Sequence, residues 1–186
     1  MRNVLILHGT GNDSQGNWFP WLKTQLEKNG FKVWVPDLPE SDVPNMKKYE
    51  DFIFSSDWEF DNNSIIVGHS SGAVAALGLL QKLPKEIAVD SCLLIASFKD
   101  DLGVKKLSGL FDEPFDFAMI KQKARNFIFM HSDNDPYCPV DHAEYLAKKL
   151  DGKLIIKKGQ GHFNLQASPK YREFPGLLEL ILSEDI

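Results

Sequence analysis

Short apolar runs alternate along this chain with longer segments that have the amphipathic pattern of helices. The short runs fall at residues 4–7, 33–35, 65–67, 93–96, 127–130 and 154–156. Helical patterns occupy residues 18–29, 70–83, 115–123 and 140–150, and a last one follows Pro169 and extends through residues 177–182. Strands that are apolar at consecutive positions are buried on both faces, which is typical of a parallel sheet covered by helices. The alternation therefore predicts an α/β fold with a doubly wound parallel sheet.

Composition and charge disfavour several classes of protein. A chain of 186 residues with 43% apolar and 25% charged residues can bury a full core without disulfides. The net charge is −5 and the lysine pairs are scattered, which argues against a nucleic-acid partner. No apolar run approaches the ~18 residues of a membrane helix, and the run near the N-terminus is too short for a signal peptide. We therefore expect one domain over residues 1–186, located in the cytoplasm, with no membrane partner.

A G-x-S-x-G pattern, G-H-S-S-G at residues 68–72, follows the third apolar run. In doubly wound sheets the ligand site lies at the carboxyl ends of the strands, so residues that follow strands are candidates for function. This pattern is typical of a sharp strand-to-helix turn that exposes a serine hydroxyl above the sheet. Its spacing predicts Ser70 as the nucleophile and the backbone N–H of Ser71 as a donor to an oxyanion. The alternative is a tight turn in which the serine has no function.

A serine nucleophile needs a base, and the base needs an acid that orients it. The sequence H-S-D-N-D-P follows the fifth run, and Asp135, held in front of a proline, is the favoured acid. Asp133 is the alternative, since an aspartate in a turn can simply bond its own backbone. After the sixth run, G-Q-G-H-F predicts His162 as the base. We expect packing, hydrogen-bonding or surface roles for the other histidines: His8, His69, His131 and His142.

The loop after the first run reads H-G-T-G-N-D-S and predicts a second oxyanion donor. Its H-G start is similar to loops that supply such a donor, with the backbone N–H of Thr10 favoured over that of Gly11. A plain glycine turn is the other interpretation. The same loop also matches part of a dinucleotide fingerprint, but its third glycine position is Ser14 and the helical pattern starts later. The pattern therefore disfavours a dinucleotide cofactor.

Taken together, these segments resemble the small α/β-hydrolases related to retinoblastoma-binding protein 9, also called YdeN-like hydrolases. The similarity rests on residues 65–73, 133–139 and 161–163, on the Trp-rich segment 17–22, and on residues 96–98 and 101–103. It implies a compact, lidless α/β-hydrolase whose six-stranded parallel sheet has the order 2-1-3-4-5-6, with helices on both faces. It also implies a triad of Ser70, Asp135 and His162. This chain lacks the L-x-C-x-E sequence that the family name implies for binding the retinoblastoma protein, so we do not expect that partner.

The expected function is cleavage of a small carboxylic ester through an acyl-enzyme intermediate, with thioesters and amides still open. Such a triad needs no cofactor and no metal, and Cys92 and Cys138 lack the spacing of a zinc site. The alternative is a non-catalytic protein-binding module on a hydrolase fold.

The expected partner is a small acyl substrate. We expect the substrate to contact Trp18, Phe98, Tyr137 and Phe163. A further group of apolar residues either walls an acyl pocket or belongs to the core: Leu107, Leu110, Phe111, Phe115 and Phe117.

Overall fold

The computed structural model describes residues 2–183, which form one parallel sheet with helices on both sides. The six strands are β1 (Asn3–Leu7), β2 (Lys32–Trp34), β3 (Ser64–His69), β4 (Val89–Ile95), β5 (Ala124–Ser132) and β6 (Lys153–Lys157). Their order in the sheet is β2-β1-β3-β4-β5-β6, and every neighbouring pair is parallel. The fold class and strand order expected from the sequence are confirmed.

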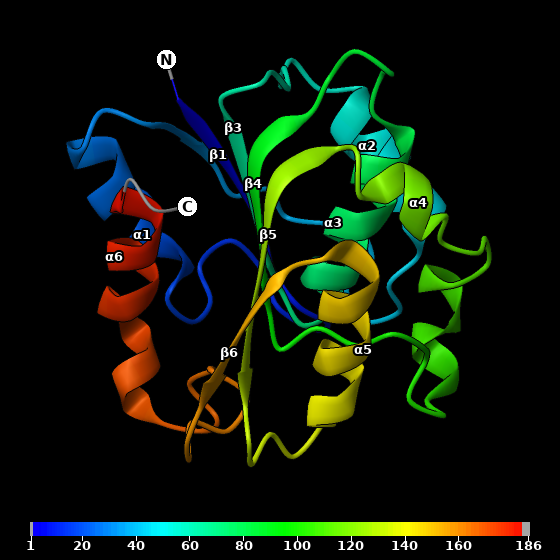
Figure 1. Cartoon of the computed structure of the whole chain (residues 1–186). Coiled ribbons are helices and arrows are strands. Elements are labelled where there is room, and N and C mark those ends of the chain that lie inside the picture. Colours follow the sequence, from blue (N-terminus) through cyan, green and yellow to red (C-terminus); the bar gives the residue numbers. More distant parts are fainter. Residues whose placement is uncertain (1, 184–186) are drawn as a thin grey trace.

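Helices cover both faces of this sheet, as Figure 1 shows with the sheet seen nearly edge-on. On one side lie α1 (Phe19–Lys28) and α6 (Pro175–Leu182). On the other lie α2 (Met46–Phe54), α3 (Ser71–Lys82), α4 (Phe117–Ile120) and α5 (Val140–Leu150). Two 3₁₀ turns, η1 (Lys105–Leu110) and η2 (Pro169–Arg172), complete the described elements.

The central strands are apolar throughout because both of their faces are buried. In β1, Leu5 and Leu7 belong to the core on the α3 side, whereas Val4 and Ile6 belong to the core on the α1 side. Successive side chains of a strand point to opposite faces, so a run without polar interruption fills both cores at once. This is the physical basis of the short apolar runs in the sequence.

Two helical segments differ from the sequence expectation. The segment 46–54 was not expected to be helical but forms α2, which starts where the Asn45 side chain accepts a hydrogen bond from the Lys48 N–H at 3.1 Å. The expected helix over 115–123 shortens to α4, capped by the Asp116 side chain, because the chain turns at residues 121–123 before β5 begins.

The carboxyl ends of the strands meet at one edge of the sheet, where the loops after β1, β3, β5 and β6 converge. Residues that the sequence singled out in four separate segments therefore lie in one region. Within residues 2–183, no helix is both long and apolar enough to cross a membrane.

Candidate active site

Ser70 lies in a sharp turn between β3 and α3, in a backbone conformation that L-residues rarely adopt. Its φ is 57° and its ψ is −122°, and its backbone N–H donates to the Ile95 carbonyl of the neighbouring strand at 2.9 Å. Such a conformation persists only where the surrounding structure imposes it, and it is typical of functional positions. The turn places Ser70 at the start of α3 and on the wall of a pocket.

Glycine at positions 68 and 72 is what allows this turn to pack. A Cβ atom on Gly72 would lie 2.3 Å from the Leu7 carbonyl oxygen of β1. A Cβ atom on Gly68 would lie 2.5 Å from Cα of Ala73 in α3. The G-x-S-x-G spacing therefore reflects direct backbone packing between α3, β1 and β3.

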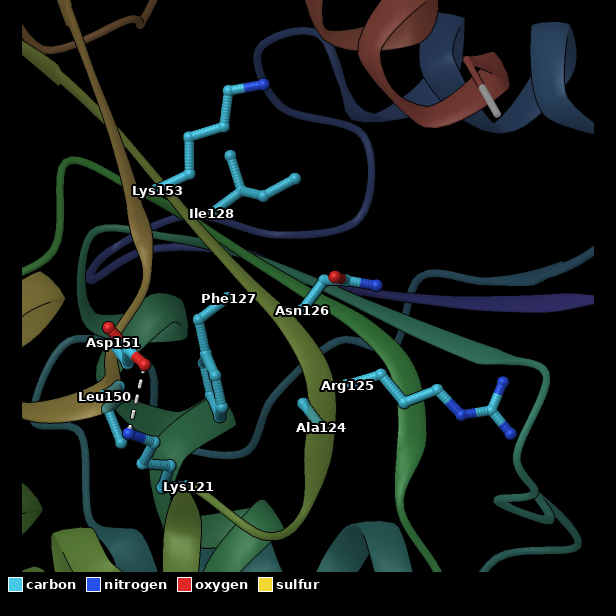
Figure 2. A pocket seen from close by; sticks show the side chains of 9 residues that line it. All are labelled: Lys121, Ala124, Arg125, Asn126, Phe127, Ile128, Leu150, Asp151 and Lys153. Carbon is cyan, nitrogen blue, oxygen red and sulfur yellow. Dashed lines mark hydrogen bonds and ion pairs between the residues drawn. The ribbon is translucent and has the colours of Figure 1, made fainter. Parts of the chain in front are cut away.

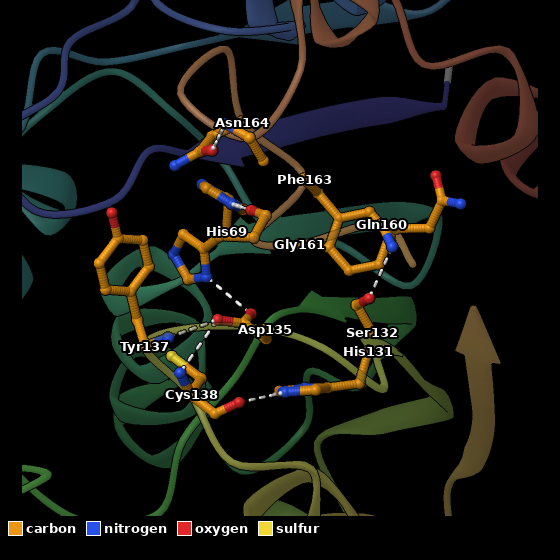
Figure 3. Close-up of polar contacts among 12 residues, drawn as sticks. His69, His131, Ser132, Asp135, Tyr137, Cys138, Gln160, Gly161, Phe163 and Asn164 are labelled. Carbon is orange, nitrogen blue, oxygen red and sulfur yellow. Dashed lines mark hydrogen bonds and ion pairs between the residues drawn. The ribbon is translucent and has the colours of Figure 1, made fainter. Parts of the chain in front are cut away.

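His162 and Asp135 form a buried hydrogen-bonded pair. His162 Nδ1 lies 2.7 Å from Asp135 Oδ2, and the exposed fractions of the two side chains are 7% and 0%. The other carboxylate oxygen accepts the backbone N–H groups of Tyr137 and Cys138 at 2.9 and 3.0 Å. Figure 3 shows Asp135 between these two residues and the loop after β6, of which Gly161 and Phe163 are labelled.

The environment of Asp135 favours its charged form. Burial raises the pKa of this carboxyl, but the hydrogen bond and charge of His162, together with the two backbone N–H groups, outweigh burial and leave the pKa below its ordinary value. A carboxylate only accepts hydrogen bonds, so the proton of neutral His162 lies on Nδ1 and Nε2 is left as an acceptor. That tautomer is the one a general base needs.

Asp133, the alternative acid, makes a different contact. Its Oδ1 accepts the backbone N–H of Gly159 at 2.8 Å and so joins the loop after β5 to the loop after β6. The carboxylate bonded to His162 belongs to Asp135.

Ser70 and His162 line the same pocket, which has a volume of about 490 Å³. Within residues 2–183, no hydrogen bond joins Ser70 Oγ to the imidazole. Catalytic hydrogen bonds often tighten only in the complex with substrate, so the lack of this bond in the unliganded protein does not argue against the pair. The pocket is lined by Thr10, Ser70, Phe98, Leu102, Val104, Lys106, Leu107, Pro136, Tyr137, Cys138, His162, Asn164 and Gln166.

Thr10 and Ser71, expected as oxyanion donors, are joined through their side chains. Thr10 Oγ1 donates to Ser71 Oγ at 2.9 Å, and Thr10 lines the pocket. Ser71 is the first residue of α3, where a backbone N–H has no acceptor within the helix. Gly11, the alternative donor, is occupied because its N–H donates to the Ser41 carbonyl at 2.9 Å.

Two of the expected substrate contacts are wrong. Trp18 and Phe163 are fully buried and pack in the core on the α1 side, away from the pocket wall. The Trp18 indole N–H donates to the Phe163 carbonyl at 3.0 Å, so this polar atom is satisfied inside the core. Phe98 and Tyr137, the other two, do line the pocket.

Part of the expected acyl wall also lies elsewhere. Leu107 lines the Ser70 pocket, together with Leu102 and Val104 from the segment that leads into η1. Leu110 is buried in the core on the α3 side. A separate hollow of about 440 Å³ is lined by Phe111, Phe115 and Phe117, with Lys99, Asp100, Glu113, Pro114 and Tyr145.

The pocket also contains polar residues that the sequence does not predict. Lys106, Asn164 and Gln166 line it beside the apolar groups. Asn164 and Gln166 follow His162 closely, so their place after β6 was a usable signal. Nothing in the sequence points to Lys106, because the direction of its side chain depends on how η1 folds over the strand ends.

Asp135, Cys138 and His162 also hold atom types that can bind a metal. One carboxylate oxygen, the thiol sulfur and one ring nitrogen lie within 4.8 Å of one another, a donor set that suits zinc. Two of these groups are already joined by the hydrogen bond between Asp135 and His162. Burial, and to a lesser degree the Asp135 charge, raises the pKa of the Cys138 thiol and favours its protonated, weakly ligating form. The arrangement therefore fits an acid–base pair better than a metal centre.

A further hollow lies at the opposite end of the sheet, where β5 and β6 begin (Figure 2). It has a volume of about 250 Å³ and is lined by Lys121, Ala124, Arg125, Asn126, Phe127, Ile128, Leu150, Asp151 and Lys153. Its Asp151 carboxylate is paired with Lys121 at 3.2 Å. Ligand sites of such sheets lie at the carboxyl ends of the strands, so the Ser70 pocket is the better candidate.

Comparison with known proteins identifies the family of this chain. The family model for serine hydrolases matches residues 4–181. The rat serine hydrolase RBBP9 is 28% identical over 159 residues, covering 84% of this chain and 83% of the relative. YdeN of Bacillus subtilis (strain 168) is 26% identical over 163 residues, covering 87% of this chain and 86% of the relative.

Solved structures show the same fold. The crystal structure of the ydeN gene product from B. subtilis superposes with a TM-score of 0.90 at 25% identity and covers 97% of each chain. Est1E from Butyrivibrio proteoclasticus, at 13% identity, has a TM-score of 0.68 over 98% of this chain and 89% of its own, which shows a shared fold alone. The chain therefore belongs to the serine hydrolase family, in the group that includes RBBP9 and YdeN.

Proposed function

We propose that this serine hydrolase cleaves small carboxylic esters, with Ser70 as nucleophile, His162 as base and Asp135 as the acid that orients the base. The observation that carries the proposal is the buried Asp135–His162 pair, at 2.7 Å, on the wall of the pocket that also contains Ser70. A serine in this type of turn has little other reason to adopt a positive φ.

The proposed reaction has two halves. His162 Nε2 takes the proton of Ser70 as its oxygen attacks the carbonyl carbon, and the backbone N–H groups of Ser71 and Thr10 stabilise the oxyanion. His162 then protonates the leaving alcohol, which leaves an ester bond to Ser70. Water, activated by the same ring, releases the acid and restores the serine. Asp135 stabilises the charged imidazolium in both halves.

The pocket suits a small acyl group better than a long chain. A volume of about 490 Å³ is in the range of small-molecule sites, and Phe98, Leu102 and Leu107 give it an apolar wall. A small-molecule acyl substrate is therefore the proposed partner. Rates with p-nitrophenyl esters of increasing chain length, compared with thioesters and aminoacyl amides, test this choice. We expect the highest kcat/KM for short esters.

A fluorophosphonate probe tests the nucleophile directly, and it separates an enzyme from the alternative of a non-catalytic binding module. We expect one adduct, on Ser70, in the wild type. Ser70→Ala and His162→Ala should lose turnover by a factor of about 10⁴ or more while remaining folded. Ser55→Ala, at the exposed end of α2, is a matched control that should behave as the wild type. An unlabelled wild type, or near-normal turnover by Ser70→Ala, would show that the proposal is wrong.

A further inference from the structure

His69, the residue before Ser70, is a buried histidine whose side chain contacts the loop of His162. Its Nε2 lies 2.8 Å from the backbone carbonyl oxygen of His162, although the two residues are 93 positions apart. A carbonyl only accepts hydrogen bonds, so Nε2 carries the proton. Nδ1 is buried and has no hydrogen-bond partner within residues 2–183, so a second proton there would add a buried charge and an unpaired donor. The ring is therefore the neutral Nε2–H tautomer. Figure 3 shows His69 beside the loop after β6, near Gly161 and Phe163.

Aromatic rings surround this imidazole on several sides. The centroid of the His69 ring lies 4.9 Å from that of His162, 5.9 Å from that of Trp18 and 6.0 Å from that of Phe19. Burial, with a further contribution from His162, lowers the pKa of His69 to about 3. The His69 ring accordingly remains a neutral donor at neutral and mildly acidic pH.

The backbone around His162 needs external support. Gly161 and Phe163, on either side of it, have φ values of 59° and 52°, and the second of these is unusual for a bulky residue. Strained conformations persist only where surrounding contacts impose them. The Gly161 N–H donates to Asn134 Oδ1 at 2.8 Å, and the Phe163 carbonyl accepts the Trp18 indole N–H at 3.0 Å. Between these two, the His162 carbonyl is held by His69.

We propose that His69 is a positioning residue that fixes the base relative to the nucleophile. The peptide bond joins His69 directly to Ser70, and the hydrogen bond from Nε2 joins it to the backbone of His162. The distance between serine and imidazole is thus set by one covalent and one hydrogen-bonded link, independently of the longer path through the sheet. This inference rests on the proposed function of Ser70 and His162, and it assigns to the middle residue of G-H-S a role of its own.

A purely structural role would have a different signature. A histidine that only fills the core affects the free energy of unfolding, and its replacement leaves the rate of the folded enzyme unchanged. A positioning residue instead affects kcat while KM changes little, because misplacement of a catalytic group by about 1 Å costs up to about 10²-fold in rate.

The decisive comparison is between His69→Phe and His69→Gln. Phenylalanine keeps an aromatic ring but lacks the donor, whereas the amide nitrogen of glutamine reaches about as far as Nε2 and can donate to the same carbonyl. For His69→Phe we expect kcat to fall by about 10- to 100-fold, with KM within about threefold of wild type. For His69→Gln we expect most of this loss to be recovered. Leu26→Ala, in the core on the α1 side, is the stability control and should leave kcat unchanged.

Two further measurements use the same proteins. The rate of Ser70 modification by the fluorophosphonate probe should follow kcat. The low-field proton NMR signal of His162 Nδ1–H, which reports the bond to Asp135, should shift or broaden in His69→Phe and return in His69→Gln. If His69→Phe does not fold, His69→Asn replaces it, because its shorter side chain cannot reach the carbonyl; kcat of His69→Gln must then exceed that of His69→Asn by about tenfold.

Wild-type kcat in His69→Phe would overturn the positioning role, and so would equal losses in the phenylalanine and glutamine variants. These outcomes differ from a failure of the proposed function, in which the wild type itself shows no adduct on Ser70.

Discussion

The Thr10 hydroxyl donates a hydrogen bond to the Ser71 hydroxyl at 2.9 Å, which links the loop after β1 to the first turn of α3. Both residues are proposed to supply backbone N–H groups to the oxyanion. Their spacing therefore depends on a side-chain contact as well as on the sheet.

Thr10→Val tests this link, because valine has the shape of threonine without its hydroxyl. We expect kcat to fall about fivefold, the equivalent of about 1 kcal/mol for one lost hydrogen bond. Thr10→Ser keeps a hydroxyl and should remain close to wild type. Steady-state rates on a short p-nitrophenyl ester measure the difference, and equal rates for the two variants would show that the contact does not matter.

Asp135→Asn and Asp133→Asn separate the two candidate acids. An amide at position 135 can donate its N–H to His162, which favours the wrong tautomer of the ring, so we expect kcat to fall by about 10⁴-fold. Asparagine at position 133 keeps an oxygen that can accept the Gly159 N–H and should leave kcat nearly unchanged. Loss of activity in Asp133→Asn alone would assign the acid to the other residue.

Trp18→Phe should reduce stability without changing substrate binding. The substitution leaves the Phe163 carbonyl without its donor and removes ring volume from the core, which we expect to lower the free energy of unfolding by about 1–3 kcal/mol. Tyr137→Ala is the contrast, because Tyr137 lines the pocket and is 53% exposed. It should raise KM and leave the denaturation midpoint nearly unchanged. A higher KM in Trp18→Phe would show that Trp18 does contribute to substrate binding.

Trp18 also shows why the sequence predicted the fold better than the pocket. The consecutive apolar residues of each strand predict that the strand is buried on both faces, as the two cores show. Parallel pairing then follows from the helices that connect the strands. The direction of a side chain at the start of α1 depends instead on the path of the preceding loop. The sequence predicts a substrate contact for Trp18, but the side chain is fully buried in the core on the α1 side.

The helix α2 lies outside the helices predicted from the sequence, although its sequence carries a helical signal. Met46, Tyr49 and Ile53 are buried at helical spacing, and Asn45 precedes them as an N-cap. The triad candidates can be predicted from the sequence, because each lies within about six residues after an apolar run and the strand ends converge at one edge of the sheet. The role of His69 had no signal in the sequence, since it depends on the carbonyl of a residue 93 positions away.

The stability of the fold should fall as the pH drops below about 6.5. Burial lowers the pKa values of His8, His69 and His131, and that of His69 falls from 6.5 to about 3. Between these two values the unfolded chain binds a proton at residue 69 that the folded chain does not, so lower pH favours unfolding. One such group changes the free energy of unfolding by about 1.4 kcal/mol per pH unit. Denaturant titrations at pH 7, 6 and 5 give the free energy of unfolding at each pH. This free energy should change less with pH in His69→Gln than in wild type or Leu26→Ala, and an equal pH dependence in all three proteins would contradict the assignment.

Lys106 gives the pocket a positive charge that should select among ester substrates. Within residues 2–183, neither Asp nor Glu lines the pocket, and none of the ion pairs includes Lys106. An ester whose acyl group ends in a carboxylate, such as p-nitrophenyl hemisuccinate, should therefore bind better than one of equal length without charge.

For Lys106→Met we expect KM for the charged ester to rise about fivefold, the equivalent of about 1 kcal/mol for an exposed ion pair, and KM for p-nitrophenyl butyrate to stay constant. The difference should shrink as salt is added, because exposed charges are screened. Lys105→Met, one residue earlier in η1 and outside the pocket lining, is the matched control. Equal changes in KM for both esters would mean that the lysine contributes its hydrocarbon chain rather than its charge.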